Sequence, residues 1–248
     1  MELVAADAKA FKQAVDAIVN LVDEGTFEIT AKGMHLRAMD PSQIAMVDFL
    51  LPAEAFAKFS VPDEAASLGV NMVDLSKILA RARSDEKLSI SLDEKAGKFV
   101  LDFIGKSKRS FKMPLIELSA ATPREPKIAF DAMVKVRGGA FKEMLKDAGL
   151  LSSHVVLQAH DSELVVEAHG DSGDLRIETK AGEAVEEVKA AAKSRAMFPF
   201  EYLDDITRAC PDDETAVVEL KSDAPIKVTY SVGQARLAYY LAPRVEQA

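Results

Sequence analysis

The sequence predicts an α+β fold of two similar domains, each built from antiparallel sheets with two helices. Three observations lead to this prediction: an internal repeat, short apolar runs between helical patterns, and a proline-rich break near the middle of the chain. With 248 residues, the chain is long enough for two domains that each bury a core. Its hydrophobic content of 48% is typical of a folded protein.

The repeat has an offset of about 128 residues and is carried by apolar positions rather than by residue identity. Leu75 corresponds to Leu203 and Leu92 to Leu220, while Phe11 in AFKQAV corresponds to Phe141 in AFKEML at a nearly equal offset. Matching positions occur in the same order over four separate blocks, which is more than chance similarity provides. The chain therefore holds two copies of one fold.

Each half contains two helical patterns. Apolar residues recur at helical spacing over 8–22 and 71–83 in the first half, and around 141–148 and over 199–211 in the second. Between them lie short apolar or alternating runs that predict strands. These runs are 26–31, 34–38, 44–51, 88–92, 99–104, 155–159, 164–168, 174–179, 216–220 and 226–232. Many short strands with few helices favour antiparallel sheets covered on one face.

Segment 114–127 interrupts both patterns with three prolines and no sustained period, which indicates an extended connector. The predicted organisation is a first domain over 1–113, a connector over 114–127 and a second domain over 128–248. The four histidines and the single cysteine, Cys210, lack metal-ligand spacing, and no phosphate-binding loop or nucleophile motif is present. The sequence therefore predicts no metal, no other cofactor and no catalytic activity. Cys210 is interpreted as a buried structural thiol.

Charge and hydropathy limit the classes of partner that the chain can bind. The net charge is −9, so a nucleic acid partner has to be met by a local basic surface. The helical patterns offer such basic positions on their polar sides, although the residues alone favour a simple solvated helix surface. No apolar run approaches the ~18 residues of a membrane span, and MELVAADAKAF does not have the pattern of a signal peptide.

Three motifs resemble one family. They are GMHLRAMD at 33–40, the run from Asn71 to Leu79 that contains SKIL, and YYLAP at 239–243 followed by Arg244 and Val245. Together they are similar to the archaeal and eukaryotic DNA sliding clamps, the proliferating cell nuclear antigen family. The resemblance covers essentially the whole chain and implies the DNA clamp fold, in which three subunits close into a ring around duplex DNA.

The resemblance implies a role for the basic side chains on the helices. In the family the helices line the hole of the ring, so these side chains are expected to face DNA phosphates without reading sequence. The expected DNA-facing residues are Lys9, Lys12, Lys77, Arg81, Lys142, Lys146 and Arg208. Gln13, Glu143 and Glu201 stand where relatives carry basic residues, so direct binding is expected to be weak and salt-sensitive.

A ring of identical subunits needs a head-to-tail interface between two different edges. The resemblance places these edges at 107–113 and 174–180, with opposite charges and apolar contacts between neighbouring subunits. The expected interface residues are Lys108, Arg109, Phe111 and Lys112 on one edge, and Asp174, Leu175, Ile177 and Glu178 on the other. Alternatively, the charges of 107–109 only protect an exposed strand edge from aggregation.

Partners of the family dock a short motif with a glutamine, an aliphatic residue and paired aromatics into a pocket of exposed apolar side chains. The matching positions in this sequence are Met39, Gln43, Ile44, Met46, Thr122, Pro123, Pro126, Pro225, Tyr240, Leu241, Ala242 and Pro243. Without the resemblance, Met39 and Met46 are interpreted as ordinary core residues.

The expected function is that of a homotrimeric processivity factor for DNA replication and repair, without catalytic activity. Its expected partners are double-stranded DNA, a replicative polymerase, a clamp loader that supplies ATP chemistry, a ligase and nucleases, with no membrane. Three alternatives remain, namely a subunit of a heterotrimeric clamp, a checkpoint-type clamp, and a two-domain enzyme with an unrecognised carboxylate site. The expected location is intracellular, in the cytoplasm or nucleoid if the source is archaeal.

Overall fold

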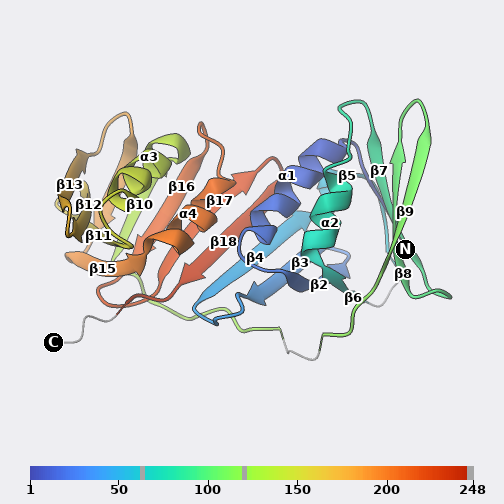
Figure 1. The fold of residues 1–248 in the computed structure, drawn as a ribbon, viewed down its shortest axis with the longest axis horizontal. Helices are drawn as coiled ribbons and strands as arrows, with labels where there is room; N and C mark the ends of the chain where they lie inside the picture. Colours follow the sequence, from blue (N-terminus) through green and yellow to red (C-terminus); the bar gives the residue numbers. More distant parts are fainter. Residues whose placement is uncertain (62–64, 119–121, 245–248) are drawn as a thin grey trace. The chain divides into compact units, whose positions relative to one another are not determined.

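The computed structural model describes residues 1–61, 65–118 and 122–244. The described chain divides into two compact units (Figure 1). The first comprises Met1–Pro41, Val47–Pro123 and Val232–Leu237, and the second comprises Ser42–Met46, Arg124–Ser231 and Ala238–Ala248. Val245 and residues 119–121, which belong to the sequence patterns above, lie outside the described residues.

The elements of the first half alternate strands with two α-helices. They are β1 (Glu2–Ala5), α1 (Ala8–Val19), β2 (Glu24–Thr30), β3 (Gly33–Met39), β4 (Ala45–Pro52), the 3-10 turn η1 (Ala53–Ala55), β5 (Phe56–Ser60), β6 (Ala66–Asn71), α2 (Met72–Leu79), β7 (Lys87–Asp93), β8 (Lys98–Ile104) and β9 (Lys108–Pro114).

The second half repeats this order. Its elements are β10 (Ala132–Arg137), α3 (Gly138–Gly149), β11 (His154–His160), β12 (Glu163–Gly170), β13 (Gly173–Lys180), β14 (Val185–Ala190), β15 (Ser194–Pro199), α4 (Phe200–Arg208), β16 (Thr215–Leu220), β17 (Ile226–Val232) and β18 (Ala235–Leu241).

Strand order confirms the duplication. In the first half the strands run β5-β1-β7-β8-β9 and β4-β3-β2-β6, and in the second half they run β14-β10-β16-β17-β18 and β13-β12-β11-β15. Raising each strand number of the first half by nine gives the corresponding strand of the second. Strands β1, β2, β7, β8, β10, β11, β12 and β16 all pair antiparallel with their neighbours. The predicted fold of two similar antiparallel domains with two helices each is thus confirmed.

The predicted helices exist, but three of them end earlier than the sequence pattern indicates, and α4 does so at Arg208. Helix α1 starts after Asp7, whose side chain accepts hydrogen bonds from two first-turn amides, and it ends at Val19 although the apolar pattern continues to Val22. Helix α2 ends at Leu79, so Arg81 lies beyond the helix instead of on it. Burial of Val22 in the core explains why the pattern outlasts the helix.

Seven strands lack a predicted counterpart: β1, β5, β6, β10, β14, β15 and β18. Most are short or polar, and their pairing is distant in sequence. The four-residue strand β1, for example, pairs with both β5 and β7. Such a strand is stabilised by its neighbours rather than by its own residues, so a local pattern does not reveal it.

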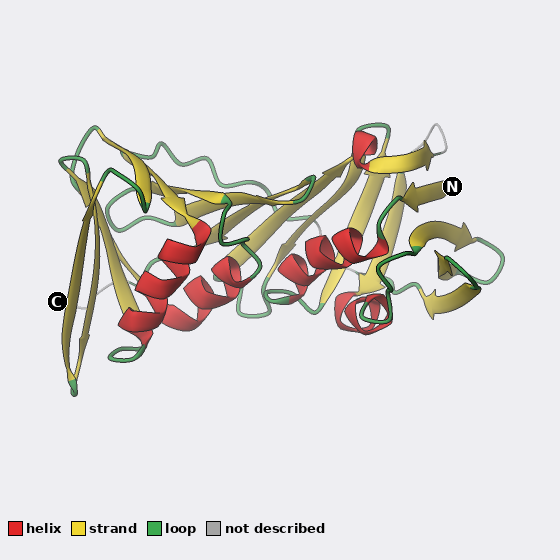
Figure 2. Cartoon of the chain, turned by 90° about the horizontal axis from the view of Figure 1, so that it is seen from above, coloured by secondary structure: helices red, strands yellow, loops and turns green. Residues whose placement is uncertain are grey.

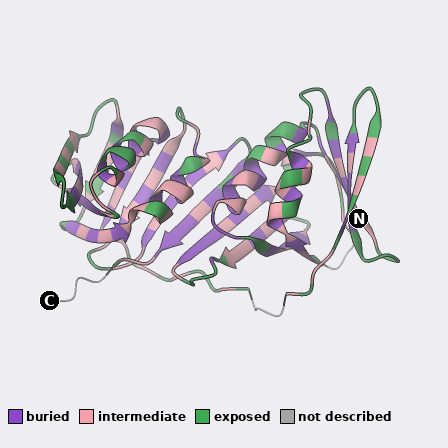
Figure 3. Ribbon diagram, viewed as in Figure 1, coloured by how far each residue is buried: buried purple, intermediate pink, exposed green. Residues whose placement is uncertain are grey.

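Each unit carries its two α-helices together on one side of its strands (Figure 2). In the first unit Phe11, Val15 and Ile18 of α1 are buried, and in the second unit Phe141, Leu145 and Ala148 of α3 are buried. Burial of these stripes leaves the polar sides of the helices exposed, as the buried and exposed positions in Figure 3 show. The fold therefore determines which charged side chains face solvent.

We predict that Leu145→Ala and Leu150→Ala have very different effects, although the chemical change is the same. Leu145 is fully buried on α3, whereas Leu150, directly after the helix, is 81% exposed. Leu145→Ala should lower the free energy of unfolding by about 2–5 kcal/mol, and Leu150→Ala by less than about 0.5 kcal/mol. Urea denaturation followed by circular dichroism measures both. Equal losses would contradict the packing described for α3.

Candidate nucleic-acid interface and docking surfaces

The helix surface of the first unit carries four of the expected DNA-facing residues. Lys12 forms an ion pair with Asp16 one turn along α1, and Lys77 pairs with Asp74 at 3.0 Å on α2. Asp16 also accepts a hydrogen bond from Ser76 Oγ at 3.0 Å, which joins the two helices. The side chains of Lys9 and Arg81 are exposed and form no ion pair with a described residue.

The helix surface of the second unit is more acidic. Lys146 pairs with Glu143 at 2.8 Å, and this contact raises the pKa of the lysine. Lys142 is mostly buried, and its ammonium donates to the carbonyl of Cys210 at 2.8 Å and lies 2.5 Å from Asp212. Lys142 therefore closes the turn after α4 and is a weaker candidate for a phosphate contact than its sequence position indicates.

Helix α4 carries three acidic residues, Glu201, Asp204 and Asp205, against one basic residue, Arg208. Arg208 lies 2.7 Å from both aspartates. Burial raises the pKa of Asp205, and the neighbouring acidic groups add to that rise against the opposing charge of Arg208. The Arg208 guanidinium is therefore already compensated within its own helix.

Strands β9 and β13 each end a sheet within the described residues, as expected for the two interface edges. β9 pairs only with β8, and β13 pairs only with β12, so each has one edge without a strand partner. Along β13, Leu175 and Ile177 are half-buried and alternate with exposed charged residues. Phe111 occupies the equivalent half-buried position on β9 and packs edge-on against Phe103.

The charges of these edges are largely engaged within their own sheets. On β9, Lys108 pairs with Asp102 at 2.8 Å and Lys112 pairs with Asp93 at 3.1 Å. On β13, Asp174 lies 2.8 Å from His169. These charges are therefore already compensated within the chain, and each such exposed ion pair contributes little.

Arg109 differs from the other basic residues of β9. Its guanidinium contacts the buried carboxylate of Glu86 at 2.6 Å and donates to the carbonyl of Arg81 at 2.9 Å. It also lies 5.1 Å from the ring centre of Phe103. The Arg109 guanidinium thus holds the loop after α2 against the sheet, because both partners belong to that loop, and its expected place in a subunit interface stays a prediction.

Glu86 links the end of α2 to the edge strand. Besides Arg109, its carboxylate accepts a hydrogen bond from the backbone amide of Arg83 at 2.9 Å. Burial acts to raise the pKa of Glu86, but the hydrogen bonds from Arg83 and Arg109 and their charges outweigh it, so the pKa lies below its ordinary value. Glu86 thus shapes the turn that follows α2.

The residues expected to form the partner pocket differ in how far they are exposed to solvent. In the second unit Ile44 is half-buried, and its carbonyl accepts a hydrogen bond from the amide of Ala242 at 2.8 Å. Gln43 is exposed with a positive φ of 60°, and Pro126, Pro225 and Pro243 are half-buried. In the first unit Thr122 is exposed, Pro123 is half-buried and Met39 is 37% exposed.

Three expected pocket residues are not exposed. Met46, Tyr240 and Leu241 have exposed fractions of only 2%, 4% and 0%. The isolated chain therefore presents no open apolar surface at these three positions. Leu241 lies on the core side of β18 with Leu237, whereas Met46 is buried on the side of β4 that also carries the half-buried Asp48. The phenol oxygen of Tyr240 nevertheless reaches a polar cluster.

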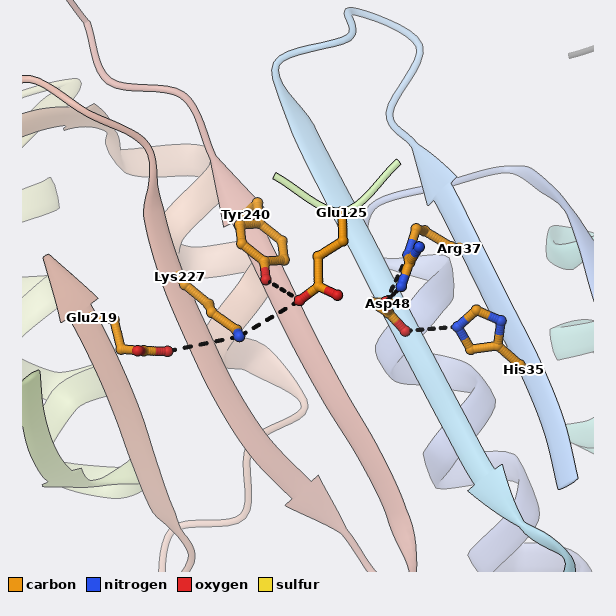
Figure 4. A network of polar contacts seen from close by, with 7 residues as sticks. All are labelled: His35, Arg37, Asp48, Glu125, Glu219, Lys227 and Tyr240. Atoms are coloured by element: carbon orange, nitrogen blue, oxygen red, sulfur yellow. Dashed lines mark hydrogen bonds and ion pairs between the residues drawn. The ribbon is translucent and has the colours of Figure 1, made fainter. Parts of the chain in front are cut away.

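Sequence reasoning missed this polar cluster of the second unit, shown in Figure 4. Tyr240 donates a hydrogen bond to Glu125 Oε1 at 2.6 Å. Lys227 Nζ lies 3.7 Å from the same oxygen and 3.8 Å from Glu219. The alternating pattern of β17 indicates that Lys227 faces outward. It does not indicate the partners of Lys227, because Glu125 and Glu219 belong to other segments of the chain.

Figure 4 also shows a polar cluster of the first unit. Asp48 on β4 receives a hydrogen bond from Arg37 Nε at 2.6 Å and lies 2.8 Å from His35 Nε2. Burial acts to raise the pKa of Asp48, but the contacts with His35 and Arg37 outweigh it and lower the pKa. All three residues are on adjacent strands, so the cluster stabilises the pairing of β3 and β4.

The described residues include no group of three side chains suited to holding a metal ion. Burial raises the pKa of Cys210 to about 12, so its thiol stays protonated and is a poor nucleophile. Among the helices described, none has the length and apolar character that crossing a bilayer requires.

Comparison with known proteins agrees with the duplicated fold. The family model for the N-terminal domain of proliferating cell nuclear antigen matches residues 1–121, and the model for its C-terminal domain matches residues 124–245. The DNA polymerase sliding clamp of Methanococcus vannielii is 32% identical over 244 residues, with 97% of both chains covered. That of Thermofilum pendens is 34% identical over 245 residues, with the same coverage.

Solved structures give the same result. Proliferating cell nuclear antigen from Thermococcus kodakaraensis superposes with a TM-score of 0.92 at 25% identity, covering 98% of this chain and 99% of that one. A complex of the C-terminal region of FEN-1 with A. fulgidus proliferating cell nuclear antigen gives a TM-score of 0.90 at 25% identity, covering 100% and 99%.

The duplicated antiparallel domains with paired helices are those of a clamp protein. The chain belongs to the proliferating cell nuclear antigen family, the DNA polymerase sliding clamps.

We predict that Glu86→Gln makes the stability of the protein less dependent on acidic pH. The pKa of Glu86 lies below its ordinary value of 4.5 in the folded chain, so its ionised form contributes stability above that pH and loses the contribution as pH falls through the lower folded value. The variant should be less stable near pH 7, with a shallower decline between about pH 5 and pH 3.

Asp85→Asn is the matched control, because it removes the same charge from the adjacent, exposed residue. Denaturant unfolding across the pH range measures both variants. Identical pH profiles for Glu86→Gln and Asp85→Asn would contradict the structural role assigned to Glu86.

Proposed function

We propose that this protein is a DNA sliding clamp that assembles as a ring-shaped homotrimer around duplex DNA and increases the processivity of a replicative polymerase. The observation that carries the proposal is the strand-by-strand duplication, with paired helices in each half and family models that match both halves. No catalytic step is assigned to it, and its role in replication and repair is to hold other proteins on DNA. The proposed domain limits are 1–113 and 128–248, joined by a connector over 114–127.

The polar sides of the four α-helices are proposed to face DNA. α1 carries Lys9 and Lys12 against Asp16, α2 balances Lys77 with Asp74, α3 balances two lysines with Glu143 and Asp147, and α4 has a net charge of −2. A surface that is close to neutral along its helices binds phosphates weakly. Weak, sequence-independent binding suits a ring that moves along DNA, because enclosure rather than affinity keeps it there.

Strands β9 and β13 are proposed to form the head-to-tail contact. Both end a sheet, both present an unpaired strand edge, and both place half-buried apolar side chains between charged ones. Because the two edges belong to different halves, their contact is heterologous and repeats around a closed ring. Phe111, Leu175 and Ile177 are proposed to supply its apolar centre, while Lys108, Lys112, Asp174 and Glu178 surround it.

The surface around Ile44, Gln43, Pro225 and Ala242 of the second unit is proposed to receive partner peptides. The proposed partners are a polymerase, a clamp loader, a ligase and nucleases that carry a glutamine, an aliphatic residue and paired aromatics. Among the structural neighbours, one is a complex with the C-terminal region of FEN-1, which supports peptide docking on this fold. An intracellular location is proposed on the same family grounds.

The oligomer mass of the isolated chain tests the ring directly. Light scattering after gel filtration should give about 81 kDa, three times the subunit mass of 26.9 kDa. Ile177→Glu, which places a charge in the apolar centre of the proposed contact, should give monomers. Leu150→Glu, at an exposed site outside both edge strands, should leave the trimer intact. A stable wild-type monomer at micromolar concentration would favour the heterotrimer alternative.

We further predict unequal effects of two substitutions on the helix surface. Arg81→Ala should lower the slope of log affinity against log salt for duplex DNA by about 1, because its guanidinium is not paired within the described chain. Lys146→Ala should lower it less, because Glu143 at 2.8 Å already compensates that ammonium. Fluorescence anisotropy with a short linear duplex measures both slopes. A larger effect for Lys146→Ala would contradict the proposed arrangement of charges.

A further inference from the structure

The polar cluster above β17 and β18 of the second unit brings two donors to one carboxylate oxygen. Tyr240 OH on β18 donates to Glu125 Oε1 at 2.6 Å, and Lys227 Nζ on β17 lies 3.7 Å from that same oxygen (Figure 4). Lys227 Nζ also lies 5.4 Å from the ring centre of Tyr240. The lysine and the tyrosine therefore form one continuous cationic and hydrogen-bonding surface.

The donors and the acceptor differ in how firmly they are held. Lys227 and Tyr240 are on neighbouring strands, and their side chains are largely covered, with exposed fractions of 24% for the Lys227 side chain and 4% for Tyr240. Glu125 lies before β10 in a segment without helix or strand, and half of its side chain is exposed. Partly exposed ion pairs are weak, so Glu125 is the replaceable member of the cluster.

We propose that Lys227 and Tyr240 form a carboxylate-binding subsite for docking peptides, and that Glu125 occupies it until an acidic side chain of the peptide takes its place. The inference rests on the proposed function, because it deepens the peptide-binding role of the same surface. It assigns a specificity to that surface: among peptides with the same glutamine and aromatics, those with a suitably placed acidic residue bind more tightly.

Charge balance favours an exchange over a simple addition. The protein has a net charge of −9, and Glu219 lies 3.8 Å from Lys227 on the side away from Glu125. Adding an acidic group to this cluster is therefore unfavourable. When Glu125 leaves as the peptide carboxylate arrives, the local charge is unchanged, and Lys227 and Tyr240 keep an acceptor of the same kind.

The test uses the complete chain and synthetic peptides that contain a glutamine, an aliphatic residue and paired aromatics. A single glutamate is placed in turn at each other position, and each peptide is compared with its glutamine counterpart by isothermal titration calorimetry. The measured quantity is the ratio of the two dissociation constants. At one position, the Glu125→Gln variant should bind the glutamate peptide about threefold to tenfold more tightly than it binds the glutamine peptide.

Wild type should show a smaller ratio at that position, because Glu125 competes for the subsite at high effective concentration. Lys227→Met should reduce the ratio to about one, because the cationic donor is gone. Glu94→Gln is the matched control: it removes one negative charge from an exposed turn between β7 and β8 and should retain the wild-type ratio. Thermal unfolding checks that each variant is folded, and Lys227→Gln replaces Lys227→Met if that protein unfolds.

The outcomes separate this inference from the proposed function. If neutral peptides bind but no position distinguishes glutamate from glutamine in any variant, the subsite is rejected and the docking surface stands. If the ratio rises as much in Glu94→Gln as in Glu125→Gln, the overall charge of the protein causes the rise, and the subsite is also rejected. If no peptide binds the wild-type chain, both the docking surface and the subsite are rejected.

Discussion

Burial of one apolar stripe on each of the four α-helices determines the surfaces of this protein. Phe11 and Ile18 fix the orientation of α1, and Phe141 and Leu145 fix that of α3, because rotating either helix would expose large apolar side chains to water. The polar residues on the opposite sides then face solvent. The proposed DNA-facing surface is thus a consequence of core packing rather than of a separate basic motif.

Most charges on these surfaces are already paired within the chain. Lys12, Lys77, Lys146 and Arg208 all contact an acidic residue on their own helix. Pairs of this kind contribute little to stability, but they reduce the positive field of the helix surfaces. For the proposed ring, which enclosure would hold on DNA, such compensation is compatible with function, because mobility requires that no single contact bind strongly.

Residues that connect elements are less visible in the sequence than residues that fill the core. Arg109 joins the edge strand β9 to the loop after α2 through Glu86, and Glu125 joins the segment before β10 to β17 and β18. Both side chains belong to segments whose sequence pattern indicates only an exposed charge. Their partners lie 23 and 115 residues away, so no local spacing identifies them.

The sequence by itself determined the duplication, the four helical stripes and most of the central strands, because periodic burial leaves a periodic pattern of apolar residues. The family was indicated by the resemblance of three short motifs. The resemblance to that family also indicated β9 and β13, two of the strands that end a sheet. Only the tertiary structure decided that Arg109 is turned toward Glu86, that Met46 and Leu241 are buried, and that Lys142 closes a turn. These facts depend on contacts between distant segments, and whether a charged or apolar side chain meets a partner or solvent is a property of those contacts rather than of its place in the chain.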